Sequence, residues 1–217
     1  MPHSNSASAK GFLIFTAAVA WFALLLQLYL MLALRPQTGL SAIEVLIRFL
    51  SFFTILSNLI VAVSLTVILL RPQSGLGRFF AKPSNMAAVA LYILVVGIVY
   101  NIILRNLWAP QGMQRWADEL LHVAVPVLYV VYYFVFVPRG HLKWTNTPGW
   151  LIYPFCYLVY SLVRGTIVKT YPYPFIDVNL IGYSSTMVNS GLLCAGFLVL
   201  GLLFVGIDKI WKSPVEK

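Results

Sequence analysis

The chain has 217 residues, of which 60% are hydrophobic and only 10% are charged. A soluble globular protein carries about 25% charged residues because its surface faces water, so the composition excludes an ordinary soluble domain. The formal net charge of +9 could indicate binding to nucleic acid, but no basic run is interleaved with aromatic residues. We therefore expect no nucleic-acid partner, and attribute the charge to membrane topology and anionic headgroups.

Six apolar segments are long enough to cross a bilayer, which takes about 20 residues of helix. In chain order they are Phe12–Leu34, Phe49–Leu70, Met86–Leu104, Leu120–Val137, Trp150–Val168 and Met187–Ile207. Helix-breaking residues, chiefly prolines, lie between them. The sequence predicts an all-α polytopic membrane protein in which residues 1–217 form a single domain, a bundle of six transmembrane helices.

The basic residues of the loops indicate how these helices are oriented. The two termini and the even-numbered loops carry nine Lys and Arg residues, whereas the odd-numbered loops and adjoining helix ends carry six and most of the acidic residues. Membrane proteins keep an excess of basic residues on the cytoplasmic side. We therefore predict that both termini are cytoplasmic.

Polar side chains inside hydrocarbon are costly, so their depth is informative. Ser51, Thr54 and Asn58 follow an i, i+3, i+7 spacing that predicts one shared helix face. At 1.5 Å of rise per residue, Thr54 lies roughly 9 Å below the outer end of its helix and His122 roughly 5–8 Å below. Thr54 and His122 are thus expected at matching depth.

Other polar residues are expected in the same outer half: Gln27, Asn101, Arg105, Ser161, Arg164 and Asn189. The inner half holds few, chiefly Thr16, Tyr153, Ser64 and Thr66. This asymmetry predicts a polar cavity in the outer half of the bilayer.

His122 is the only histidine inside a predicted span, since His3 and His141 fall in a tail and a loop. Asp118 precedes it by one helical turn, so the carboxylate could orient the imidazole as a general base. Pro126 lacks the N–H that would bond the His122 carbonyl, which predicts a loosened helix there. The alternative interpretation is a histidine that only forms hydrogen bonds between helices.

A threonine hydroxyl beside an imidazole is the arrangement of an activated nucleophile, which makes Thr54 a candidate. Asn58, one turn deeper, could donate to an oxyanion. Ser51 and Ser57 are rival nucleophiles. The simpler interpretation is a hydroxyl that bonds a carbonyl of its own helix.

Arg164 and Tyr157 share a stripe on the fifth segment, and with Ser51 and Asn101 they are candidates for substrate binding. An arginine at a helix end can bind a lipid carboxylate or phosphate, or only extend to the headgroups. The stripe could equally be a packing face. Gly191 and Gly196 are expected to ease helix packing in the sixth segment.

Several motifs resemble one membrane protein family. The run from Arg48 to Leu59, with Thr54, Ser57 and Asn58, resembles the threonine-bearing segment of the androgen-induced-gene membrane protein family. Leu121–Pro126 looks like the H-x-x-x-P helix of that family, and the runs 153–165 and 171–175 are similar to its bacterial branch.

The resemblance implies a threonine hydrolase that cleaves fatty acid esters of hydroxy fatty acids, with Thr54 as nucleophile and His122 as base. It covers roughly residues 48–177. The expected mechanism needs no cofactor, and the sequence contains no metal-ligand cluster. The roles of Asp118, Asn58 and Arg164 come from their positions alone. Likeness to the bacterial branch predicts a bacterial inner-membrane location.

The leading hypothesis is an intramembrane lipid ester hydrolase, with a membrane lipid as its substrate. The second is a lipid or small-molecule carrier whose polar cavity only binds. Transporters often have inverted repeats and broken helices, and neither is evident in this sequence.

Overall fold

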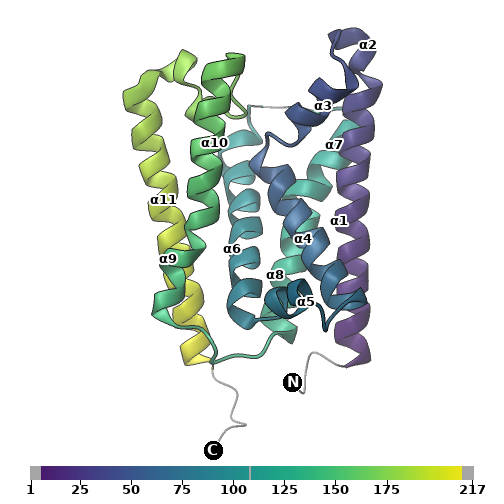
Figure 1. Ribbon diagram of the computed structural model, residues 1–217, viewed down its shortest axis with the longest axis vertical. Coiled ribbons are helices and arrows are strands. Elements are labelled where there is room, and N and C mark those ends of the chain that lie inside the picture. Colours follow the sequence, from purple (N-terminus) through teal and green to yellow (C-terminus); the bar gives the residue numbers. More distant parts are fainter. Residues whose placement is uncertain (1–5, 108, 212–217) are drawn as a thin grey trace, which may run out of the picture. The chain divides into compact units, whose positions relative to one another are not determined.

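The computed structural model describes residues 6–107 and 109–211 (Figure 1). His3 lies outside these ranges, as do Lys212 and Lys217, two of the nine basic residues counted for the termini and even-numbered loops. The described residues form helices and no strand, so the all-α fold predicted from the sequence is confirmed.

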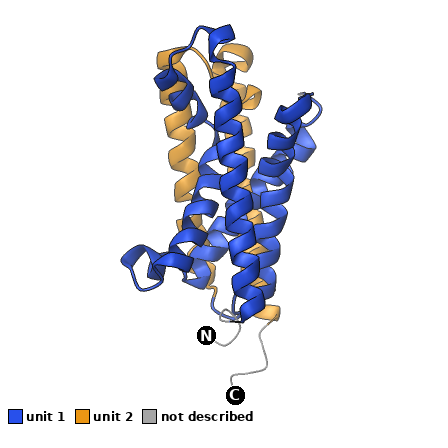
Figure 2. Ribbon diagram, turned by 90° about the vertical axis from the view of Figure 1, so that its right-hand side faces the viewer, with its two compact units in different colours: residues 1–141, 213–217 blue, residues 142–212 orange. Residues whose placement is uncertain are grey.

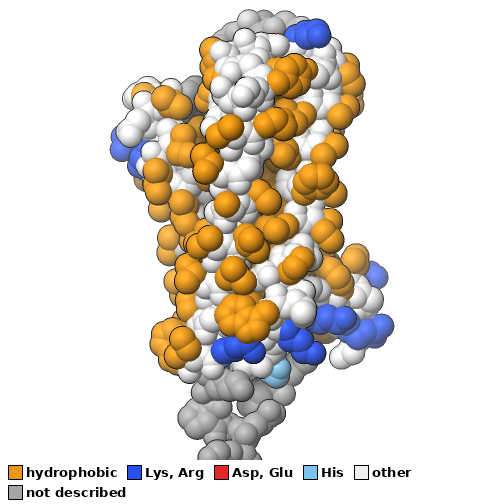
Figure 3. Space-filling model, turned by 90° about the vertical axis from the view of Figure 1, so that its left-hand side faces the viewer, with side chains coloured by type: hydrophobic (Ala, Val, Ile, Leu, Met, Phe, Trp, Pro, Cys, Tyr) orange, Lys and Arg blue, Asp and Glu red, His pale blue; other side chains and the backbone are white. Residues whose placement is uncertain are grey.

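Six helices are long and apolar enough to cross a membrane, which makes the chain a multi-pass membrane protein. They are Ala7–Ala33, Phe53–Leu70, Pro83–Leu104, Gly112–Phe136, Trp144–Val168 and Val178–Ile210. Large apolar side chains on them face outward; Phe22 is 59% exposed and Leu192 67%. Figure 3 shows one face on which hydrophobic side chains cover the middle and Lys and Arg lie toward the ends, as lipid contact requires.

The chain divides into two compact units (Figure 2). The first comprises residues 1–141 and 213–217, and the second residues 142–212. Each is described by itself, and the single six-helix domain stays a prediction.

Four of the spans belong to the first unit, and short helices join them (Figure 1). Its elements are α1 (Ala7–Ala33), α2 (Arg35–Thr38), α3 (Ala42–Phe49), α4 (Phe53–Leu70), α5 (Gly75–Phe80), α6 (Pro83–Val99), η1 (Tyr100–Leu104), α7 (Gly112–Glu119), η2 (Leu120–Ala124) and α8 (Val125–Phe136). Buried alanines of α1, such as Ala20 and Ala23, let it pack closely along α4. The elements η1 and η2 are π-helical turns that continue α6 and join α7 to α8.

The second predicted span is wrong at its start, because α3 ends at Phe49 and α4 begins at Phe53. Ser51 lies in the turn between them, where its hydroxyl donates to the Arg48 carbonyl at 2.6 Å. Serine side chains compete with helical hydrogen bonds in this way. Ser51 therefore does not share a helix face with Thr54, whereas Thr54 and Asn58 are one turn apart on α4.

The second unit contains η3 (Trp144–Asn146), α9 (Thr147–Trp150), α10 (Ile152–Val168), η4 (Pro174–Ile176) and α11 (Val178–Ile210). A Cβ atom added at Gly165 would lie 2.0 Å from the Tyr171 ring, so this glycine permits the loop to fold back on α10. At Gly191 and Gly196 an added Cβ would meet no described atom within 4 Å. Within the second unit no described atom therefore packs against either glycine, and a role of these glycines in helix packing stays a prediction.

Candidate active site

Thr54 and His122 lie together in the first unit, a meeting that their matching predicted depths allowed but did not require. The Thr54 Oγ1 atom is 3.2 Å from His122 Nε2. Thr54 is the second residue of α4 and is 7% exposed, and His122 occupies the π-helical turn η2. A hydroxyl and an imidazole at hydrogen-bond distance, shielded from water, are the first two members of a nucleophile–base–carboxylate arrangement.

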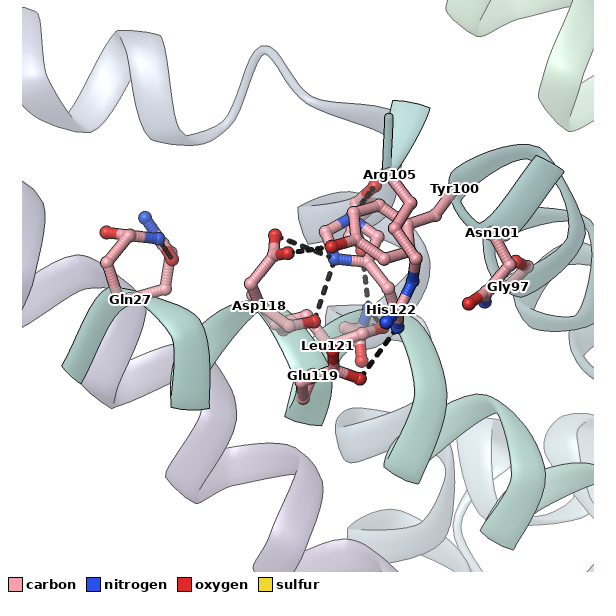
Figure 4. Close-up of polar contacts among 12 residues, drawn as sticks. Gln27, Gly97, Tyr100, Asn101, Arg105, Asp118, Glu119, Leu121 and His122 are labelled. Atoms are coloured by element: carbon pink, nitrogen blue, oxygen red, sulfur yellow. Dashed lines mark hydrogen bonds and ion pairs between the residues drawn. The ribbon is translucent and has the colours of Figure 1, made fainter. Parts of the chain in front are cut away.

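Asp118 supplies the third member, one turn before His122 (Figure 4). The His122 Nδ1 atom is 2.9 Å from the Asp118 carbonyl oxygen and 3.2 Å from its Oδ1. Both atoms are acceptors, so Nδ1 carries the proton of the neutral ring. Nε2 is then the acceptor and the Thr54 hydroxyl the donor, which is the tautomer that a general base needs.

Tyr100 also belongs to the site, and the sequence analysis missed it. Its hydroxyl donates to Asp118 Oδ2, and its ring stacks on the imidazole of His122 with centroids 4.0 Å apart (Figure 4). Tyr100 lies roughly 6 Å below the end of the third span, close to the depth predicted for His122. Depth arithmetic applied to tyrosines could have found it.

Asn58 has a different position from the one that the oxyanion hypothesis requires. Its amide nitrogen donates to the Thr54 carbonyl at 2.8 Å and to the Leu121 carbonyl at 3.1 Å. Both amide protons are thereby used, so none remains for an oxyanion. Asn58 instead ties the first turn of α4 to η2 and fixes the two reactive side chains relative to each other.

The Leu121 carbonyl is available to Asn58 because of Pro126. In η2 the Val125 N–H bonds the Leu120 carbonyl, five residues back. The next bond of this register would join Leu121 to position 126, where proline has no N–H. The loosened helix predicted at Pro126 is therefore present as a π-helical turn, and the carbonyl left without a helical partner is that of Leu121.

Close packing of α6 on η2 depends on Gly97. A Cβ atom added there would lie 3.3 Å from the His122 carbonyl oxygen and 3.3 Å from Pro126 Cβ. These separations are too short for most real side chains. Gly97 thus lets the Tyr100 helix approach the His122 helix closely enough for their rings to stack.

Three other polar residues of the first unit that were expected in the outer half make contacts of their own. Asn101 is exposed, and its amide donates to the Gly97 carbonyl at 2.8 Å. Arg105 pairs with Glu119 at 2.8 Å. Gln27 accepts a hydrogen bond from Gln114 at 2.8 Å, which joins α1 to α7.

Arg164 and Tyr157 lie on α10 in the second unit. Arg164 donates to the Thr170 carbonyl at 3.3 Å, and the Tyr157 ring lies 6.3 Å from that of Tyr160. These contacts favour the packing interpretation of the stripe, and substrate binding by Arg164 and Tyr157 stays a prediction. Among the residues described, no group of three His, Cys, Asp or Glu side chains could hold a metal ion.

No protein-family model matches the chain, and no curated protein or solved structure matches it significantly. The family resemblance of the motifs therefore stays a prediction, and the site is interpreted from its own geometry.

Proposed function

We propose that the protein is an intramembrane lipid ester hydrolase with Thr54 as nucleophile and His122 as general base. The observation that carries the proposal is the 3.2 Å contact of Thr54 Oγ1 with His122 Nε2. This contact is stronger evidence because Asp118 lies against the opposite ring nitrogen, Nδ1, and leaves Nε2 as the acceptor. A histidine that only linked helices would not need this tautomer.

In the proposed reaction Thr54 Oγ1 attacks the ester carbonyl carbon while its proton passes to His122 Nε2. The imidazolium then protonates the leaving alkoxide, which departs as the alcohol and leaves an acyl-threonine. A water molecule, deprotonated by His122, attacks the acyl carbon. The carboxylic acid is released, and the Thr54 hydroxyl is restored by the proton held on His122.

The surroundings of the pair fit this sequence of steps. The Asp118 carboxylate stabilises the imidazolium that forms twice per cycle, and Tyr100 holds that carboxylate by donating to Oδ2. Thr54 lies in the first turn of α4, where the helix dipole places partial positive charge beside a developing oxyanion. This contribution replaces the one expected of Asn58.

The substrates that we propose are fatty acid esters of hydroxy fatty acids or related lipids, which the motif resemblance implies. The enclosure of the pair within apolar spans supports a lipid that enters sideways from the bilayer. A bacterial inner membrane and cytoplasmic termini are part of the same proposal, and the charge distribution of the loops supports the orientation.

The test is labelling of the purified protein with a fluorophosphonate probe, which reacts with activated hydroxyl nucleophiles. We expect Thr54→Ala and His122→Ala to lose the label and Thr54→Ser to keep it. Ser64→Ala is the matched control, because Ser64 is equally buried on α4 but bonds the Val61 carbonyl. Equal labelling of the wild type, Thr54→Ala and His122→Ala would exclude the hydrolase and favour a protein that only binds lipid.

A further inference from the structure

A hollow of about 250 Å³ lies where η1 is joined to α7. Tyr100, Arg105, Arg115 and Glu119 line it, together with residues 109–111. The third span ends at Leu104 and the fourth begins at Gly112, so the hollow is at the end of two membrane spans. This is the depth at which the charged part of a lipid meets water.

The charged side chains around the hollow leave positive charge unpaired. Arg105 is paired with Glu119, and Arg115 has no hydrogen bond or ion pair to any described residue. The Arg105 Nε atom is buried and has no acceptor. Two arginines against one glutamate give the hollow a net charge of +1, which favours one negatively charged group.

Tyr100 connects the hollow to the proposed active site. It lines the hollow, and its ring stacks on the imidazole of His122 with centroids 4.0 Å apart. The Arg105 guanidinium carbon is 5.1 Å from the centre of the same ring. A ligand with an anionic end between the arginines would therefore lie against the same tyrosine ring that stacks on the His122 imidazole.

We propose that this hollow binds the oxyanion group of the lipid substrate, a carboxylate or a phosphate, through Arg115 and Arg105. The inference rests on the proposed function and adds a charge requirement to it. The Arg105–Glu119 pair is more than a third exposed on both sides. Its net stabilisation is therefore small, and Arg105 can turn toward a ligand at little cost.

The test compares three esters of equal chain length in neutral detergent: one with a terminal carboxylate, one with a terminal phosphate and one with a neutral end. We expect the wild type to have a lower KM for at least one anionic ester than for the neutral one. Arg115→Gln should raise that KM about 3- to 10-fold, as for a partly exposed charged contact, and leave the neutral ester unchanged. The anionic ester with the larger effect identifies the natural group.

Arg35→Gln is the control variant, since Arg35 is an exposed arginine of α2 that does not line the hollow. Equal KM values for all three esters in the wild type would overturn the proposal. So would an equal effect of Arg115→Gln and Arg35→Gln.

Direct binding of the two anionic lipids, as non-hydrolysable ethers, is measured in parallel for the same variants. Binding that weakens in Arg115→Gln but not in Arg35→Gln supports the site even if no ester is hydrolysed. In that case the hydrolase proposal alone would fail. Binding unaffected by Arg115→Gln would overturn the anion site.

Discussion

Buried hydroxyls toward the two ends of α4 have different kinds of partner. Ser64 donates to the Val61 carbonyl of its own helix at 2.9 Å, and Thr16 of α1 does the same with Phe12 at 2.8 Å. Thr54, in contrast, is 3.2 Å from an imidazole on another helix. Burial of a hydroxyl in a membrane helix is therefore weak evidence of function, and a partner on a second element is much stronger evidence.

Replacing Thr54 and Ser64 of α4 one at a time should give the largest difference in hydrolysis rate. Thr54→Ala removes the proposed nucleophile, and we expect ester hydrolysis to fall by about 10³-fold or more. Ser64→Ala removes a hydroxyl that bonds the Val61 carbonyl and faces Tyr129, but it leaves the proposed nucleophile in place and should change the rate less than about twofold. Release of free fatty acid by purified protein measures both. Similar rates for the two variants would show that the Thr54 hydroxyl is no more important for hydrolysis than that of Ser64.

Asp118→Asn tests whether the imidazole tautomer matters. An amide at this position can donate to Nδ1 and turn the proton toward Nε2, which would block proton abstraction from Thr54. We expect kcat to fall by about 10²- to 10⁴-fold, as when the carboxylate of a catalytic triad is replaced. A rate within threefold of the wild type would mean that Asp118 has no part in the reaction.

Tyr100→Phe should have a smaller effect, because the ring and its stacking on His122 are kept while the bond to Asp118 is lost. Loss of one hydrogen bond to a carboxylate predicts a decrease in kcat of about 3- to 10-fold with KM nearly unchanged. Tyr100→Leu, which also removes the stacking on His122, should lower kcat further. Steady-state kinetics of both variants separate the two contributions.

Gly97→Ala tests whether α6 must lie close to η2, and the effect is measured on the stability of the protein. The added Cβ would lie 3.3 Å from two atoms of the neighbouring helix, and we expect a loss of about 1–2 kcal/mol in unfolding free energy. Gly191→Ala is the control, because nothing described lies within 4 Å of its Cβ and alanine favours helix. Thermal unfolding in detergent should rank Gly97→Ala below the control, and the reverse order would contradict the close approach.

The smallest expected effect is at the capping box of α3, outside the spans. Hydrogen bonds from the Ser41 hydroxyl and backbone N–H lower the pKa of Glu44 from its ordinary value of 4.5. A lowered carboxyl pKa contributes stability that is present above the ordinary value and is lost as the pH falls through the lowered one. The difference in melting temperature between the wild type and Glu44→Gln should therefore be larger at pH 7 than at pH 4. A constant difference would exclude this linkage.

The sequence led us to expect Thr54 and His122 at one depth, and the two side chains do meet. The helix bounds behind that expectation differ from those of the structure, because α4 begins at Phe53 and the span that holds His122 begins at Gly112. The sequence could not show how each helix is turned about its axis, which decides whether two side chains meet. The π-helical turn η1 changes this rotation near Tyr100, and no residue type marks such a turn reliably. Depth arithmetic could therefore have marked Tyr100 as a candidate, but it could not have predicted that its ring stacks on His122.

Two other differences have local causes. The break between α3 and α4 contains neither proline nor glycine, so no residue there signals that Ser51 leaves the helix. Asn58 has two donors and two carbonyl acceptors within reach, and only the position of η2 decides that its second donor goes to Leu121 rather than to a ligand. Such a choice depends on tertiary structure.

The number of residues in the π-helical turn η2 also determines where the His122 side chain lies. A π-helical turn contains about one residue more than the α-helix it interrupts. Deleting a single residue between Leu120 and Ala124 would restore a continuous α-helix and leave the parts before and after the turn nearly in phase, but it would rotate the residues within the turn, His122 among them. Such a deletion, at Val123 for instance, would keep Thr54, Asp118 and His122 in the chain while moving the imidazole off the threonine. The number of residues in this turn is thus as essential to the site as their identity.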